Sequence, residues 1–224
     1  ALLNVTPDHL DRHGTIENYA AIKARIFDRL PADGTAVIGV DDDYCRAIAD
    51  ALRGPYAVKR IAVGHPGETG VWAKDGMLTE VDKGVERGRL GLDGIGSLRG
   101  AHNWQNAATA YALARSQGLD ASTIAKGLGT FAGLAHRMEQ VARVGPVLFV
   151  NDSKATNVEA ARRAIESFDH DLVVIVGGRF KGGDLGLLRT PLAARARAVV
   201  VVGEAAPLIR EALAGAVPIH AASS

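Results

Sequence analysis

The chain has 224 residues, of which 47% are hydrophobic and 23% are charged. These proportions are typical of globular proteins and exclude a largely disordered or fibrous chain, while the length allows one large domain or a medium domain with a smaller one. Lysine and arginine total 26 against 25 aspartate and glutamate, so the net charge of +1 gives no general attraction to nucleic acid or to an anionic membrane.

The cysteine content and the lengths of the apolar runs indicate in which compartment the protein works. The single cysteine, Cys45, cannot form an internal disulfide and has no zinc-site neighbours, which fits a reducing cytoplasm. The longest apolar runs, 172–176 and 198–202, are far shorter than the roughly 20 residues of a membrane-spanning helix, so we expect no membrane insertion. The chain opens without Met and as though inside a strand, and we expect it to be a piece of a longer protein.

The first half of the chain combines helices and strands. A single helical stripe predicts an amphipathic helix over residues 16–30. Its members are Ile16, Tyr19, Ile26, Phe27 and Leu30. Asp75-Gly76 between short apolar runs predicts a hairpin. The other elements expected here are a strand at 35–40 and helices at 44–52, 102–116 and 121–128.

Beyond residue 133 strands and helices alternate, which predicts a parallel sheet with covering helices. The strands are expected at 147–150, 172–176 and 198–202, and the helices at 158–168 and 206–213. We place a domain boundary near Leu134, which divides the chain into domains of residues 1–134 and 135–224.

Lys23 is the least ordinary residue of the first helix, because it lies among the apolar side chains of Tyr19, Ile26 and Phe27. Partial desolvation favours the neutral amine, which is the form that reacts as a nucleophile or with carbon dioxide. The alternative is a lysine whose stem covers apolar surface while its head reaches water.

Acidic and histidine residues cluster near the N-terminus. His9 and His13 have the i, i+4 spacing that can share a metal, and Asp8 and Asp11 lie beside them. The alternative is the start of a helix, with Thr6 as the cap and acids in the first turn.

Residues 151–157 form a mainly polar loop between a predicted strand and a predicted helix, where open α/β sheets bind ligands. Lys154 can hold an anionic group and Thr156 can donate a hydrogen bond, although helix capping is an alternative role for this loop. The glycine-rich stretch 177–184 resembles a phosphate cradle but lacks the Gly-Lys-Ser/Thr ending of a P-loop, and a flexible loop is the alternative. Arg137, which follows His136, can clamp phosphate or form a structural ion pair.

Five motifs in this order resemble the Mur ligase family. They are NVTPDHLD at 4–11, Lys23, HNWQN at 102–106, HRME at 136–139 and NDSKATN at 151–157. The last of them resembles the branch of the family that adds D-glutamate. The resemblance implies an α/β fold, in which a central ATPase-type mixed-sheet domain is followed by a Rossmann-like α/β domain, each present in part.

The resemblance also implies an enzyme, an ATP-dependent ligase that joins D-glutamate to UDP-N-acetylmuramoyl-L-alanine through an acyl phosphate. This step belongs to peptidoglycan synthesis and hence to cell-wall biogenesis, cell shape and cell division. ATP and Mg²⁺ are the implied cofactors, and we expect a cytoplasmic monomer. Because the family's UDP-binding domain and phosphate loop would precede Asn4 and its last segment would follow Ser224, we expect this chain alone to be inactive.

Residue roles carry over from the matching motifs. Lys23 matches a lysine that becomes carbamylated, and a carbamate would give Mg²⁺ an oxygen ligand beside His9. Arg137 completes the expected catalytic set by clamping the transferred phosphate. The residues matching ATP contacts are Asn106, Arg137 and Asp152, and those matching substrate contacts are Lys154, Thr156 and, with a weaker match, His136.

Two alternatives differ in class. A sister Mur ligase or a folylpolyglutamate-type ligase would share the architecture, but the loop at 151–157 favours the D-glutamate branch. A non-catalytic nucleotide-binding module is the second alternative, which nucleotide titration would distinguish.

Overall fold

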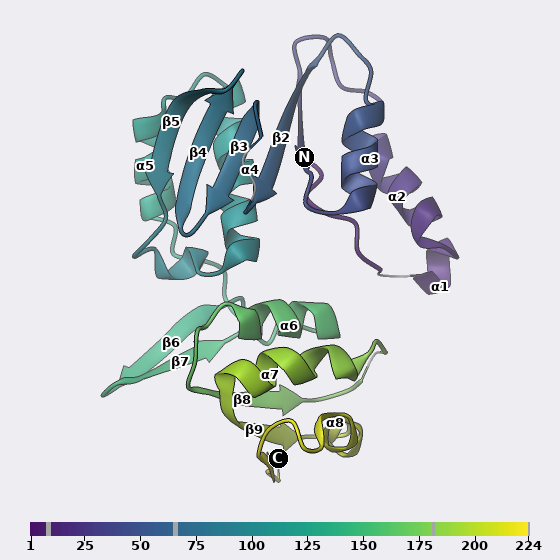
Figure 1. Ribbon diagram of the computed structural model, residues 1–224, viewed down its shortest axis with the longest axis vertical. Helices are drawn as coiled ribbons and strands as arrows, with labels where there is room; N and C mark the ends of the chain where they lie inside the picture. The colour runs from purple at the N-terminus through teal and green to yellow at the C-terminus, as the bar shows by residue number, and fades with distance from the viewer. Residues whose placement is uncertain (8–9, 65–66, 181, 224) are drawn as a thin grey trace. The chain divides into compact units, whose positions relative to one another are not determined.

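The computed structural model describes residues 1–7, 10–64, 67–180 and 182–223, and it divides into two compact units (Figure 1). Unit 1 is Ala1–Phe131 and unit 2 is Ala132–Ser224. The division falls close to Leu134, the domain boundary expected from the sequence. Each unit has its own sheet and core. Within the described residues, no helix is long and apolar enough to cross a membrane.

Unit 1 is built on a mixed five-stranded sheet in the order β1-β2-β3-β4-β5. Its strands are β1 (Thr35–Gly39), β2 (Ala57–Val63), β3 (Gly70–Lys74), β4 (Met77–Asp82) and β5 (Val85–Gly91). The first three strands are parallel, and β4 and β5 continue the sheet in antiparallel fashion. Asp75 and Gly76 join β3 to β4 with φ values of 48° and 72°, as a type I′ turn requires. The predicted hairpin is therefore confirmed.

Helices cover both faces of β1. Alternate residues of a strand point to opposite faces, so neighbouring residues of β1 lie in different cores. Val37 faces the core under the long helix α4, whereas Ala36 and Ile38 face the core under α2 and α3. The helical elements of unit 1 are α1 (Leu10–His13), α2 (Ile16–Ala24), the 3₁₀ turn η1 (Arg25–Phe27), α3 (Asp43–Ala51), η2 (Gly96–Leu98), α4 (Ala101–Ser116) and α5 (Ala121–Gly129).

The apolar stripe predicted for residues 16–30 is wrong at its C-terminal end. Helix α2 stops at Ala24, and the chain continues as a 3₁₀ turn. Phe27 is buried, but Ile26 is 57% exposed. Because a 3₁₀ turn has three residues per turn rather than 3.6, the residues after Ala24 no longer follow the stripe of the α-helix.

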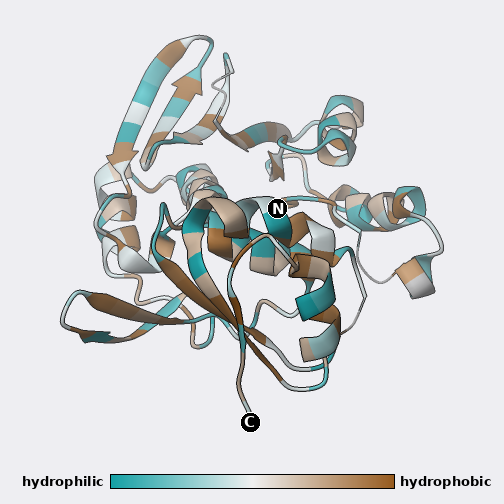
Figure 2. Cartoon of the chain, turned by 60° about the horizontal axis from the view of Figure 1, so that its bottom comes forward, coloured by the Kyte–Doolittle hydropathy of each residue, from teal (hydrophilic) through white to brown (hydrophobic). Residues whose placement is uncertain are grey.

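Unit 2 has a parallel three-stranded sheet in the order β10-β9-β8, which confirms the parallel sheet expected from the sequence. Its strands are β8 (Leu172–Gly177), β9 (Ala196–Val202) and β10 (Ile219–Ala221). Its helical elements are α6 (Val158–Glu166), η3 (Leu185–Leu188), α7 (Arg189–Arg195) and α8 (Ala206–Leu213). These elements share one core with Val199 and Val201 of β9. Strands β8 and β9 consist mostly of apolar residues (Figure 2).

The strand predicted at 147–150 exists, but its expected place in the parallel sheet is wrong. It is β7 (Val147–Asn151), and it pairs antiparallel with β6 (Glu139–Val144) in a separate two-stranded sheet. Gly145, at φ 56°, and Pro146 form the loop between Val144 and Val147. This loop favours a hairpin because glycine readily adopts a positive φ and proline fixes its own.

Candidate functional site

Lys23 lies near the end of α2 and contacts the N-terminal segment of unit 1. Its Nζ atom donates a hydrogen bond to the carbonyl oxygen of Asn4 at 3.0 Å and lies 5.0 Å from the centroid of the Tyr19 ring. The half-buried amine is therefore held by one backbone acceptor and one aromatic face. This arrangement orients the amine toward the segment that contains the motif NVTPDHLD.

Asp42 holds the same peptide group from its other side. The amide of Val5, which shares a peptide bond with the Asn4 carbonyl, donates to Oδ2 of Asp42 at 3.1 Å. The second carboxylate oxygen, Oδ1, accepts the amide of Cys45 at 2.8 Å and caps α3. This role of Asp42 was not predicted from the sequence. The only signal was the run of three aspartates after the first strand, which by itself also fits a simple turn.

A second contact links this region to α4. Gln105, which is buried, donates from Nε2 to Oδ2 of Asp41 at 2.8 Å, and Oδ1 of Asp41 accepts the amide of Val63 at 2.9 Å. The next residue, Asn106, is exposed and donates from Nδ2 to Oδ1 of Asn103 at 3.3 Å. Helix α4 therefore fixes the backbone of Asn106 while its side chain stays accessible to a ligand.

The predicted metal site can be described only in part. Asp8 and His9 lie outside the described residues, while the ring of His13 stacks on the ring of Tyr19 with centroids 4.9 Å apart. Within the part of the chain that the structure describes, no three His, Cys, Asp or Glu residues are grouped to hold a metal ion.

In unit 2 the structure joins two motifs that are separate in the sequence. The amide of Met138 donates to Oδ1 of Asp152 at 3.0 Å, and the amide of Lys154 donates to the carbonyl of His136 at 3.0 Å. His136 and Met138 have φ values of 64° and 47°, which residues other than glycine rarely adopt. These hydrogen bonds stabilise the strained turn and leave the Arg137 side chain, between the two residues, exposed.

The loop after β7 keeps most of its predicted ligand groups accessible. Asn157 caps α6, because its Oδ1 accepts the amide of Ala160 at 2.8 Å. The cap therefore requires neither Asp152 nor Thr156. Lys154 and Thr156 are exposed, and Asp152 is half-buried beneath the turn that contains Arg137. The structure thus brings five predicted site residues of unit 2 into one loop cluster, namely His136, Arg137, Asp152, Lys154 and Thr156.

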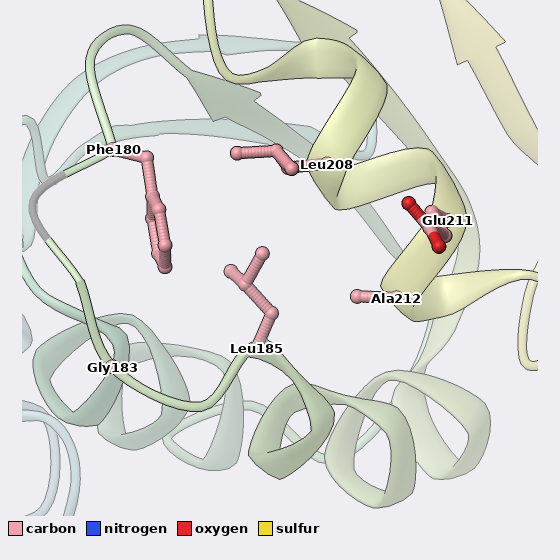
Figure 3. A pocket seen from close by; sticks show the side chains of 6 residues that line it. All are labelled: Phe180, Gly183, Leu185, Leu208, Glu211 and Ala212. Carbon is pink, nitrogen blue, oxygen red and sulfur yellow. The ribbon is translucent and has the colours of Figure 1, made fainter.

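The glycine-rich stretch after β8 borders a shallow depression of about 310 Å³ (Figure 3). The side chains of Phe180, Leu185 and Leu208 point toward this space. The other described residues that line it are Gly183, Glu211 and Ala212. Among the described residues the lining is apolar with one carboxylate, which does not suit a phosphate group.

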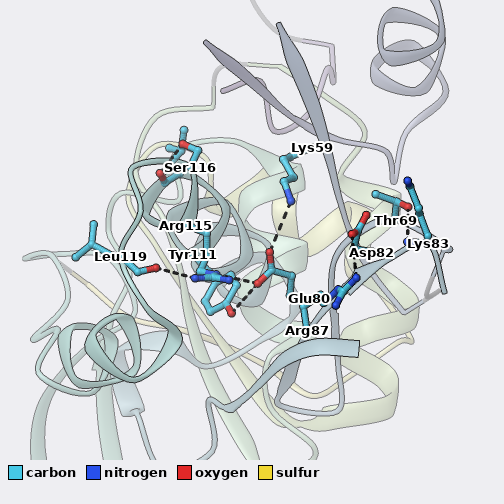
Figure 4. A network of polar contacts seen from close by, with 11 residues as sticks. Lys59, Thr69, Glu80, Asp82, Lys83, Arg87, Tyr111, Arg115, Ser116 and Leu119 are labelled. Carbon is cyan, nitrogen blue, oxygen red and sulfur yellow. Dashed lines mark hydrogen bonds and ion pairs between the residues drawn. The ribbon is translucent and has the colours of Figure 1, made fainter. Parts of the chain in front are cut away.

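A buried ion network fixes α4 against the sheet (Figure 4). The Glu80 carboxylate on β4, which is 6% exposed, accepts hydrogen bonds from Arg115 Nε at 2.9 Å and Tyr111 OH at 3.1 Å. Lys59 Nζ on β2 lies 3.6 Å from its other oxygen. This network was not predicted from the sequence, because nothing in the residues around Glu80 indicates that its carboxylate is buried.

Burial and ion pairing shift two pKa values in this network. Burial alone would raise the pKa of Glu80, but the hydrogen bond and charge of Arg115, with Tyr111 and Lys59, outweigh it and lower the pKa. Burial, followed by the Glu80 charge, raises the pKa of Tyr111 to about 12. Glu80 is therefore ionised and Tyr111 neutral at physiological pH.

Comparison with known proteins assigns the chain to a family. The profile of the Mur ligase middle domain matches residues 1–114, and that of the Mur ligase glutamate ligase domain matches residues 136–224. The chain belongs to the Mur ligase family.

Named relatives share nearly the whole length of this chain. It is 49% identical over 228 aligned residues to a UDP-N-acetylmuramoylalanine–D-glutamate ligase of Brucella abortus (strain 2308), covering 98% of this chain and 46% of the relative. It is 44% identical over 220 residues to the enzyme of the same name from Rhodospirillum rubrum, covering 97% of this chain and 46% of the relative. The chain therefore spans about half the length of these relatives.

Solved structures share the fold at low sequence identity. MurF from Acinetobacter baumannii is 22% identical with a TM-score of 0.69, over 97% of this chain and 49% of the MurF chain. Mycobacterium tuberculosis folylpolyglutamate synthase, complexed with ADP, is 22% identical with a TM-score of 0.65, over 97% of this chain and 52% of the synthase. At this identity the likeness shows the fold alone.

Proposed function

We propose that this chain is part of an ATP-dependent ligase that joins D-glutamate to UDP-N-acetylmuramoyl-L-alanine during peptidoglycan-precursor synthesis. The observation that carries this proposal is the 49% identity, over 98% of the chain, to ligases named for that reaction. The fold alone would not separate this activity from a folylpolyglutamate-type ligase, because both kinds of structure resemble it. We further propose that the enzyme acts in the cytoplasm as a monomer.

In unit 1 we assign Lys23 and His9 to a magnesium site and Asn106 to ATP. The contacts of Lys23 with Asn4 and Tyr19 support this assignment, because they fix the amine beside the segment that leads to His9. Carbamylation would convert that amine into an anionic oxygen ligand suited to a hard cation. When bound, Mg²⁺ neutralises phosphate oxygens as the phosphoryl group is transferred.

In unit 2 we assign Arg137 and Asp152 to ATP and phosphate, and Lys154, Thr156 and His136 to the amino-acid substrate. The exposure of Arg137, Lys154 and Thr156 supports these roles, since all three present their polar ends to solvent. Two cations in one loop cluster favour an anionic ligand, and an arginine can bind its oxygens in pairs. Orientation by such groups can account for several kcal/mol of barrier reduction.

The proposal is tested with a chimera, in which this chain replaces the matching segment of the Brucella abortus ligase. Phosphate release is measured with ATP, Mg²⁺, UDP-N-acetylmuramoyl-L-alanine and either D-glutamate or other amino acids. We expect release with D-glutamate only. Release with a different amino acid would overturn the substrate assignment, and a folded chimera that is inactive with every amino acid would overturn the ligase assignment. Because the relatives are about twice as long, we expect the 224-residue chain alone to release no phosphate.

A variant pair tests the role of Lys154 in the chimera. Lys154→Ala removes the ammonium group assigned to a D-glutamate carboxylate, so we expect the KM for D-glutamate to rise by at least about tenfold. Lys126→Ala removes an exposed lysine of α5 and is expected to leave that KM unchanged. Equal KM values in the two variants would remove Lys154 from the substrate site.

A further inference from the structure

Asn151 connects a backbone amide to the ring of His136. It is the last residue of β7, opposite Glu139 of β6. Its Oδ1 atom accepts the amide of Ser153 at 3.1 Å, and its Nδ2 atom lies 2.9 Å from Nδ1 of His136. The side chain thus makes one hydrogen bond at each end.

These two contacts determine which ring nitrogen of His136 carries the proton. A backbone N–H can only donate, so the end of Asn151 that faces Ser153 must be its oxygen. The end that faces His136 is then the NH₂ group, which can only donate, and Nδ1 must supply a lone pair. A neutral imidazole with an unprotonated Nδ1 has its proton on Nε2. We infer that Asn151 holds His136 in the Nε2–H tautomer, so that His136 meets its ligand as a neutral hydrogen-bond donor.

Glu139 does not change this assignment. Its Oε2 accepts the backbone amide of His136 at 2.7 Å and lies 3.9 Å from Nδ1, which is too far for a hydrogen bond. Glu139 therefore fixes the backbone of His136, while Asn151 fixes its ring. The ring edge that bears Nε2 remains available, because the side chain is 57% exposed and Nε2 has no hydrogen-bond partner within the described residues.

The inference deepens the proposed function and rests on it for the identity of the ligand. A neutral N–H donor requires an acceptor atom, and the cations of Arg137 and Lys154 in the same loop cluster favour an anionic one. The ligand atom is therefore an anionic oxygen, either from a phosphate or from a carboxylate. Asn151 is a positioning residue in this arrangement, since it acts through the ring of His136.

The tautomer is tested by imidazole nitrogen NMR on the 224-residue chain at about pH 8, above the ordinary pKa of about 6.5 for histidine. His136→Gln identifies the His136 signals by their loss. We expect the unmodified chain to show a protonated Nε2 and an unprotonated Nδ1. Asn151→Asp puts a carboxylate oxygen against the ring, which requires a proton on Nδ1, so we expect Nδ1 to become protonated. Glu139→Gln keeps an oxygen for the backbone amide and is expected to leave the tautomer unchanged.

A protonated Nδ1 in the unmodified chain, or a tautomer that Asn151→Asp does not alter, would overturn the inference. This readout needs no substrate, so it separates failure of the inference from failure of the proposed ligase activity. An inactive chimera with the expected NMR pattern would overturn the function and leave the tautomer assignment standing.

Donation by Nε2 is tested in the chimera with two amides. Gln at position 136 can place an NH₂ group near the former Nε2, whereas Asn places one near the former Nδ1. We therefore expect His136→Gln to retain at least about tenfold more kcat/KM than His136→Asn. Equal losses would refute donation from Nε2. A rise in the KM for ATP in His136→Asn would assign the acceptor to a phosphate of ATP, and a rise in the KM for D-glutamate would assign it to a carboxylate.

Discussion

The two units hold their candidate site residues in different ways. In unit 1 the relevant hydrogen bonds join distant parts of the chain, such as Gln105 to Asp41 across 64 positions and Val5 to Asp42 across 37. In unit 2 the bonds from the Arg137 turn to the far end of the hairpin and its loop span only 14 to 18 positions, as between Met138 and Asp152 or between His136 and Lys154. The geometry of the first site therefore depends on the fold of the whole unit, and that of the second on a local hairpin and its loop.

The two units also differ in how deeply their polar groups are buried. The polar groups that fix α4 in unit 1 are buried, including Gln105 and Glu80, whereas the site residues of unit 2 are mostly exposed. A buried polar group that loses its partner loses a hydrogen bond that water does not replace. Substitutions in the buried contacts of unit 1 should therefore cost more stability than comparable substitutions in the loop cluster of unit 2.

The largest effect is expected for Glu80→Ala. Removing the carboxylate leaves Arg115, Lys59 and Tyr111 without their shared acceptor, and breaking such a buried pair costs about 3 kcal/mol. Urea unfolding followed by tryptophan fluorescence measures this loss, because Trp72 and Trp104 both lie in unit 1. Glu86→Ala removes an exposed partner of Arg89 and should cost less than 1 kcal/mol by the estimate of about 0–1 kcal/mol for surface pairs. Equal losses would contradict the importance of burial.

Lowering the pH should destabilise unit 1 by protonating the Glu80 carboxylate. The folded state lowers the pKa of Glu80, so its ionisation stabilises unit 1 fully above the ordinary glutamate value of 4.5. That contribution is lost as the pH falls from 4.5 through the lowered folded pKa. Glu80→Gln lacks the titrating group, so its stability should fall less steeply than that of the unmodified chain below pH 4.5. Parallel stability curves from urea unfolding at several pH values would contradict this expectation.

A smaller difference is expected between two helix caps, one in each unit. Asp42→Ala removes both the cap of α3 and the acceptor for Val5, whereas Asn157→Ala removes only the cap of α6. We expect losses of about 2 kcal/mol and about 1 kcal/mol respectively. Hydrogen exchange measured separately on peptides from each unit detects both losses. A loss for Asp42→Ala no greater than that for Asn157→Ala would mean that the contact with Val5 contributes nothing.

Local patterns predicted the elements well, and long-range contacts explain what they missed. The Asp75-Gly76 turn and the parallel strands of unit 2 follow from short sequence signals, and the structure confirms both. The antiparallel pairing of β7 was missed because its partner β6 has no strong strand pattern of its own. The site residues came from motifs, and their roles stay predictions. The roles of Asp42, Glu80 and Asn151 could not be predicted from the sequence, because they depend on partners that only the fold brings near.

The smallest effects are expected for substitutions of two glycines of unit 1. They test whether loss of stability in this unit is specific to buried contacts or follows from any substitution. Gly127 lies inside α5, and a Cβ atom there would have no neighbour within 4 Å, so Gly127→Ala should stabilise unit 1 by about 0.5 kcal/mol through lower chain entropy. Gly118 has equally open space but a φ of 83°, so Gly118→Ala should destabilise the unit by about 1 kcal/mol. Tryptophan fluorescence during urea unfolding reports both changes. If Gly127→Ala also lowered stability, unit 1 would be sensitive even where nothing is packed, and the large cost expected at Glu80 would no longer point to the buried network.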